Sequence, residues 1–319
     1  MLLGAQAAQD ASLFGPVAQP SPAGSSSTVS VRETRTSGET RPKPAGEDAA
    51  TSRNRNRDAT VEIPFEFREG LLWVKVTLLQ SAETLNFLLD TGAGASVINR
   101  STADRLKLKP GRATTVRGVA TTFTGYRLQG IAVRANGVSL PSDYLAVDLA
   151  RLSGSCERPV DGLLGADFFR GRVIQLDLLA QKLRILKAPQ VSFSAETLPL
   201  ELRPCGMIIP ITVNGHKGQW VRLDTGCASA LQWVSARLRP GDCKTQVAIG
   251  LAEVSIPQAQ TTVEIGHQKF TEVPTGLHEN AIFAGEAGLL GNGLLARFSS
   301  ITIDTKARRL ILEVNEPLP

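Results

Sequence analysis

The sequence predicts an all-β protein built from two similar lobes. From about residue 60 onward, short runs of apolar and β-branched residues alternate and are interrupted by Gly, Pro and Asn, as strands and turns are. Asn136-Gly137 and Asn214-Gly215 indicate hairpins, because both central residues of a type I′ turn need a positive φ. The same succession of features also occurs twice, over 61–186 and over 198–312, which predicts an internal duplication.

Each half of the duplication has the same order of elements. A hairpin leads into an Asp-Thr-Gly triplet. An amphipathic stretch that ends in Pro-Gly follows, then a turn of small residues, further strands, a Gly-Leu-Leu-Gly segment and a strand ending in Asp. The matched segments are Pro110-Gly111 and Pro240-Gly241, the turns at Gly118 and Gly250, residues 162–165 and 288–291, and residues 174–177 and 301–304.

Four parts of the chain are expected. Residues 1–58 are rich in Ser, Pro, Gly, Ala, Thr and Arg without apolar periodicity, which predicts a disordered tail. An N-terminal lobe over 59–187, a linker over 188–197 and a C-terminal lobe over 198–319 follow. Residues 1–8 resemble the end of a secretory signal but lack its positive beginning. They favour an extracytoplasmic location, periplasmic or secreted.

Composition excludes several classes of function. Of the 319 residues 42% are hydrophobic, but no run reaches the ~18 apolar residues of a membrane-spanning helix. Much of the net charge of +5 comes from the tail, and no basic block interleaved with aromatics indicates nucleic-acid binding. The cysteines form no C-x-x-C pair and the three histidines are dispersed, so we expect no metal and no cofactor. Whether disulfides form stays open for Cys156, Cys205, Cys227 and Cys243.

Two carboxylates stand out by their setting. Asp90 closes the apolar run 87–89 and Asp224 closes the run 221–223, and each acid enters a Gly turn. A turn role would suit an isolated Asp-Gly segment. Two acids that each follow an apolar run and precede a Gly turn instead indicate a paired-carboxylate site. Such a site performs acid and base chemistry without a cofactor.

These motifs resemble the aspartic proteases. The features shared with the retropepsin-like enzymes are Asp-Thr-Gly-Ala at 90–93, Ser96 six residues after the acid, and Asp-Gly-Leu-Leu-Gly at 161–165. Their duplication in one chain is similar to the two-lobed pepsin-like enzymes, over residues 60–313. The resemblance implies two β-barrel lobes of the acid-protease type, related by a pseudo-two-fold axis with a cleft between them.

The resemblance also implies roles for single residues. Asp90 and Asp224 would be the catalytic pair, and Thr91 and Thr225 would hydrogen-bond across the interface. The remaining candidates are glycines: Gly92 and Gly226 would permit the tight turns, and Gly118 and Gly250 would form flaps over the cleft. The expected partner is an extended peptide or protein substrate, bound by a monomeric endopeptidase.

Two departures from the pattern leave alternatives open. The second copy has Cys227 in place of Ala93 and Ala230 in place of Ser96, so the support around its acid differs. A catalytically degenerate protein that binds peptides with a protease fold is one alternative. Another is a self-processing protease whose Arg-rich tail is a pro-segment.

Overall fold

Strands make up most of the chain, which confirms the all-β prediction. The computed structural model describes residues 6–7, 59–81, 83–118, 121–234, 244–249 and 252–314. The expected disordered tail therefore lies outside the described residues, apart from the two-residue strand β1 (Gln6–Ala7). No helix among the described residues is long and apolar enough to cross a membrane.

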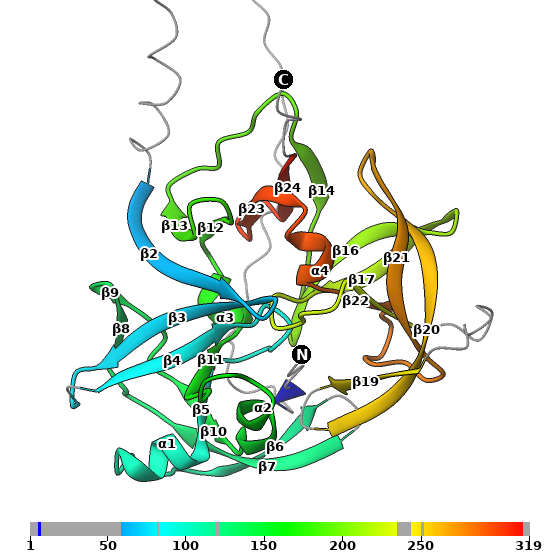
Figure 1. The fold of residues 1–319 in the computed structure, drawn as a ribbon. Helices are drawn as coiled ribbons and strands as arrows, with labels where there is room; N and C mark the ends of the chain where they lie inside the picture. Colours follow the sequence, from blue (N-terminus) through cyan, green and yellow to red (C-terminus); the bar gives the residue numbers. More distant parts are fainter. Residues whose placement is uncertain are drawn as a thin grey trace, which may run out of the picture. The chain divides into compact units, whose positions relative to one another are not determined.

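The N-terminal lobe begins with three antiparallel strands (Figure 1). They are β2 (Ala59–Arg68), β3 (Leu71–Leu78) and β4 (Thr84–Leu89). Glu69 and Gly70, with φ of 56° and 72°, form the turn between the first two. The lobe continues with β5 (Val97–Asn99), β6 (Ala113–Gly118), β7 (Thr121–Leu128), β8 (Val133–Ala135), β9 (Val138–Ser139), β10 (Tyr144–Val147), β11 (Gly162–Leu164), β12 (Val173–Asp177) and β13 (Lys182–Leu186).

The C-terminal lobe repeats this arrangement. Its longest strands, drawn in yellow and gold in Figure 1, form one antiparallel pair, β20 with β21. The strands are β14 (Glu196–Pro199), β15 (Glu201–Arg203), β16 (Gly206–Val213), β17 (His216–Leu223), β18 (Leu231–Val234), β19 (Lys244–Ile249), β20 (Ala252–Ile265), β21 (Gln268–His278), β22 (Gly288–Leu290), β23 (Phe298–Asp304) and β24 (Arg309–Val314).

Both hairpins predicted from Asn-Gly pairs are confirmed. Asn136 and Gly137 have φ of 44° and 80° and connect β8 to β9. Asn214 and Gly215 have φ of 48° and 80° and connect β16 to β17. In the described part of the chain four short helices accompany the strands: α1 (Arg100–Arg105), α2 (Ala150–Gly154), α3 (Ala166–Phe169) and α4 (Asn292–Leu295).

One short strand in each lobe determines where the acids lie. In the N-terminal lobe β11 runs parallel to β4 and antiparallel to β5, with Leu164 opposite Leu89. In the C-terminal lobe β22 runs parallel to β17 and antiparallel to β18, with Leu290 opposite Leu223. The duplicated Gly-Leu-Leu segments are therefore the strands that lie beside the ends of the acid-bearing strands.

A sheet formed by both lobes joins the two halves. The strands that end in Asp pair with each other, since β12 runs antiparallel to β23 with Leu176 opposite Ile301. Their hairpin partners β13 and β24 extend the sheet to β2, which continues it into β3, and to the edge strand β14. Leu176, Ile301 and Ile303 are buried in a core of mostly aliphatic side chains that includes residues of both lobes. The halves therefore share one hydrophobic core.

Candidate active site

Asp90 and Asp224 lie at equivalent places in the two lobes. Each follows the last residue of its strand, β4 or β17. The amide of Asp90 donates to the carbonyl of Leu164 and that of Asp224 to the carbonyl of Leu290, both at 2.9 Å. The strands β11 and β22 thus fix the backbone of both acids.

The structure brings the two acids together at the junction of the lobes. Their side chains are 1% and 0% exposed. A Cβ added to Gly92 would lie 2.3 Å from Oδ2 of Asp224, and one added to Gly226 would lie 2.5 Å from Cγ of Asp90. Each acid therefore lies against the glycine of the opposite loop, so any side chain at Gly92 or Gly226 would displace it.

Backbone amides of each acid's own loop hold its carboxyl group. The amide of Ala93 donates to Oδ1 of Asp90 at 3.0 Å. The amide of Gly226 donates to Oδ1 of Asp224 at 2.9 Å. Oδ2 of Asp224 is buried and has no hydrogen-bond partner within the described part of the chain.

Thr91 and Thr225 link the two loops by four hydrogen bonds. The amide of Thr91 donates to Oγ1 of Thr225 at 3.1 Å, and the amide of Thr225 donates to Oγ1 of Thr91 at 3.0 Å. Each hydroxyl donates in turn across the junction, Thr91 to the carbonyl of Leu223 at 2.7 Å and Thr225 to the carbonyl of Leu89 at 2.9 Å. All of these groups are buried, so the bonds fix the separation of the acids without competition from water.

Burial next to a like charge separates the titrations of the two acids. Burial, reinforced by the charge of Asp224, raises the pKa of Asp90 well above its ordinary value. Burial also raises the pKa of Asp224, to about 6. The pair therefore titrates in two separate steps, and between them it holds a single proton.

The two loops are supported in different ways. Oγ of Ser96 donates to Asp167 at 2.7 Å and accepts from the amide of Gly165 at 3.1 Å. In the second copy the amide of Gly291 donates instead to the backbone carbonyl of Ala230 at 3.0 Å. A backbone oxygen thus replaces the missing hydroxyl, so the departure at Ala230 does not leave the second loop without its hydrogen bond.

Cys227, the other departure, is fully buried beside the second acid. Its Sγ lies 2.9 Å from Oγ of Ser229, and burial raises the pKa of the thiol. A buried thiol with a raised pKa is a poor nucleophile. Among the described cysteines, Cys156 and Cys227 form no disulfide, and Cys243 lies outside the described residues.

Of the two flap candidates, Gly118 lies within the described residues and Gly250 does not. Gly118 ends β6, opposite Thr121 of β7, and residues 119–120 between them lie outside the described part. Gly250 also lies outside it, between the paired residues Ile249 and Ala252. The flap role of both glycines stays a prediction. Within the described chain no three His, Cys, Asp or Glu side chains form a group able to hold a metal ion.

Sequence reasoning missed two contacts between the lobes. Nδ2 of Asn292 donates to the carbonyls of Gly70 and Thr225, both at 2.7 Å. The guanidinium of Arg222 reaches the carbonyl of Gly92 at 2.8 Å. The available signal was Arg222 itself, a charged residue in an otherwise apolar run that leads into Asp224.

Comparison with known proteins shows similarity to the aspartic proteases. Residues 74–168 match the model of the aspartyl protease family. The structure is similar to that of an aspartic proteinase from Irpex lacteus, with a TM-score of 0.53 at 13% identity, over 80% of this chain and 97% of that one. The search of curated proteins gave no match.

These findings confirm the predicted resemblance to the aspartic proteases and the two-lobed fold. The family match covers the first Asp-Thr-Gly loop and the strand β11 beside it. The structural similarity extends the fold to most of the chain. Together they support a protease function.

Replacing Thr225 by Val tests the bonds between the two loops. The substitution leaves the buried amide of Thr91 without its acceptor and the carbonyl of Leu89 without its donor. We expect the free energy of unfolding to fall by about 2 kcal/mol, measured by urea denaturation. Thr77→Val on the exposed face of β3 is the control and should change it by no more than about 0.5 kcal/mol. Equal effects of the two variants would contradict the structural role.

The raised pKa of Asp224 predicts how Asn at this position affects stability. An unfolded Asp titrates near pH 4, whereas the folded pKa is about 6, so the protein loses stability as the pH rises through this window. Asp224→Asn has no charge to bury. It should unfold like the wild type at pH 4 and be more stable by roughly 1–3 kcal/mol at pH 7. Urea denaturation at the two pH values measures this, and an equal stability change at both would refute it.

Proposed function

We propose that the chain is an aspartic endopeptidase in which Asp90 and Asp224 activate a water molecule that attacks a peptide bond. The observation that supports this most directly is the juxtaposition of two buried carboxyl groups, one from each half of the duplication. Such a pair shares a proton, so one member is a base and the other an acid at the same pH.

The surroundings of the two acids support a different role for each. We assign the base role to Asp224, which lies against Gly92 and whose buried Oδ2 would take the proton of the attacking water. Asp90, whose pKa burial and the charge of Asp224 raise well above its ordinary value, would donate its proton to the oxygen of the scissile carbonyl. The tetrahedral diol then collapses once a proton reaches the amide nitrogen, releasing a carboxylic acid and an amine.

A substrate would lie extended across the junction of the lobes. Strands β6 and β7, which end in the turn after Gly118, would cover it. Extended chains bind through main-chain hydrogen bonds, while pockets for alternate side chains select the sequence. Because one chain supplies both acids, a monomer would be sufficient for activity.

Mutating each acid tests the single-site mechanism. Asp90→Asn and Asp224→Asn should each lower kcat on a peptide library by about 10²- to 10⁴-fold, and the double variant should be little worse. The exposed Asp143→Asn is the matched control and should retain wild-type turnover. Near-normal turnover of Asp224→Asn would instead indicate a site that uses Asp90 of two chains. Inhibition by a mimic of the tetrahedral diol provides an independent check.

The pH dependence should follow the titration of the pair. Activity needs one charged and one neutral acid, so kcat/KM against pH should be bell-shaped. Because the pKa of Asp224 is about 6, kcat/KM should drop to half of its maximum near pH 6 on the acidic side, not near pH 2. Stopped assays from pH 3 to 9 measure both limbs. A profile that stays flat above pH 8 would contradict the proposal.

A further inference from the structure

Arg222 is a fully buried cation on the strand that leads into Asp224. Its exposure is 0%, and it is among the largest completely buried side chains. Nε and Nη2 donate to the two oxygens of Glu286 at 2.8 and 2.6 Å, and the guanidinium lies 3.5 Å from the ring centroid of Phe283. Burying such a pair is no gain over apolar residues of similar volume, so its presence indicates a specific role.

The remaining donor of Arg222 points toward the first acid loop. Nη1 donates to the carbonyl of Gly92 at 2.8 Å and to that of Cys205 at 2.7 Å. The peptide that carries the Gly92 carbonyl also carries the amide of Ala93, which donates to Oδ1 of Asp90. The charged donor on the carbonyl therefore holds this peptide, and with it the Ala93 amide, in a fixed position. Arg222 is thus linked to Asp90 through one peptide group.

The arrangement exists in only one copy of the duplication. Sheet register places Arg222 opposite Leu289 of β22 and Leu88 opposite Leu163 of β11. Leu88 is therefore the equivalent of Arg222, and it is buried among apolar side chains. Two loops of the same sequence pattern consequently lie in unequal electrostatic surroundings.

We propose that Arg222, held by Glu286, is a positioning residue that makes the two acids unequal. It fixes the Gly92–Ala93 peptide against Asp90 and places a positive charge close to Asp224, so that Asp224 is the charged base and Asp90 holds the proton. The assignment of base and acid rests on the proposed function, whereas the electrostatic effect of Arg222 on the pair does not.

The charges around the two acids favour the ionised form of Asp224 over that of Asp90. Burial raises the pKa of Asp224, and the positive charge of Arg222 opposes the rise. For Asp90 the charge of Asp224 adds to burial and raises the pKa further. The other ionisable groups involved, in the described part of the chain, are Glu286, which neutralises Arg222, and the Cys227 thiol, which burial keeps protonated.

Two variants change the electrostatic surroundings of Asp224 in different ways. Arg222→Met with Glu286→Met removes the pair without leaving a buried charge. Glu286→Gln keeps the hydrogen-bonding shape but leaves the cation without a counter-charge. The guanidinium, and not Glu286, contacts the Gly92 carbonyl, so the double variant should raise the lower apparent pKa of the acid pair. Glu286→Gln adds a net positive charge and should lower it by about one unit.

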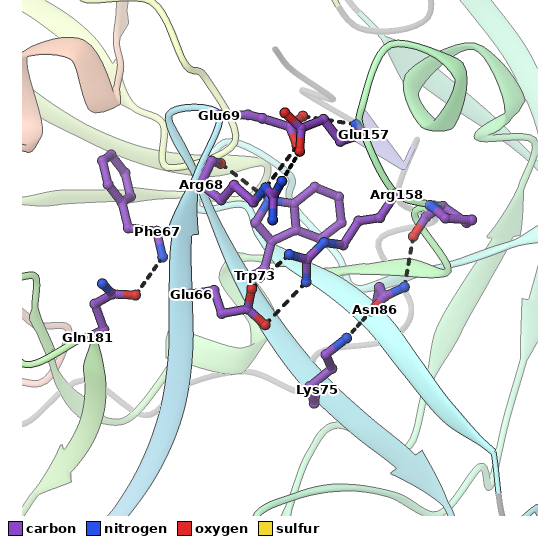
Figure 2. Close-up of polar contacts among 11 residues, drawn as sticks. Glu66, Phe67, Arg68, Glu69, Trp73, Lys75, Asn86, Glu157, Arg158 and Gln181 are labelled. Atoms are coloured by element: carbon purple, nitrogen blue, oxygen red, sulfur yellow. Dashed lines mark hydrogen bonds and ion pairs between the residues drawn. The ribbon is translucent and has the colours of Figure 1, made fainter.

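The control is a second Arg–Glu pair, which is more exposed to solvent (Figure 2). Arg158 donates to both oxygens of Glu66, at 3.2 and 2.7 Å, and its guanidinium lies 5.2 Å from the ring centroid of Trp73. Arg158→Met with Glu66→Met removes an ion pair of the same two residue types, formed by Glu66 of β2 and by Arg158, which packs on Trp73 of β3. It should leave the titration of Asp90 and Asp224 unchanged.

The readout is a carboxyl ¹³C NMR titration of the full chain labelled at Asp. Asp90→Asn and Asp224→Asn assign the two signals, and thermal unfolding establishes that each variant is folded. Unchanged titration in either folded test variant, or a shift equal to that of the control, would overturn the proposal. If the double variant does not fold, Glu286→Gln decides, because it removes only one charge.

Activity distinguishes this proposal from the proposed function. If the wild type cleaves peptides, the acid limb of kcat/KM should move up in the double variant and down in Glu286→Gln, while the control retains the wild-type limb. If the NMR titrations shift as expected but no peptide is cleaved, the role of Arg222 stands and the endopeptidase proposal fails. If peptides are cleaved but the titrations of the acid pair do not shift, the endopeptidase proposal stands and the proposed role of Arg222 fails.

Discussion

Two carboxyl groups of like charge are buried side by side where the lobes meet, and most of the neighbouring structure serves to keep them there. Charges of the same sign at such a distance repel strongly in an interior of low polarity. The repulsion is relieved when one acid keeps its proton, but only if the separation is fixed. The reciprocal bonds of Thr91 and Thr225 fix it, because each hydroxyl bonds the backbone of the opposite lobe.

This constraint extends well beyond the acid loops. The loops can be no more rigid than the lobes that carry them, and the lobes are joined by the sheet in which β12 pairs with β23. The aliphatic core beneath that sheet includes side chains from both halves. Asn292 adds a buried contact from the second acid loop to the turn at Gly70. Packing far from the acids therefore controls their separation.

The duplication allowed much of this to be predicted from the sequence. A repeated Asp-Thr-Gly at the end of an apolar strand identified Asp90 and Asp224, and the repeated Gly-Leu-Leu identified the strands β11 and β22 that lie beside them. The β12–β23 pairing was not predicted, because alternation in a strand indicates a buried face but not the partner strand. Arg222 was missed for a related reason: a single charge in a short strand usually faces solvent, and its partner Glu286 lies 64 residues away.

A shared proton already makes one acid of the pair a base and the other an acid, and unequal surroundings favour one particular assignment. With identical surroundings the proton would lie on either acid with equal probability. The two halves of this chain share the same backbone arrangement but differ in two contacts. The hydroxyl of Ser96 in the first half is replaced in the second by the backbone carbonyl of Ala230, and Leu88 is replaced by Arg222. The first difference leaves the hydrogen bond of the loop in place. The second adds a charge, and a charge in a buried setting is the more effective way to decide which acid is ionised.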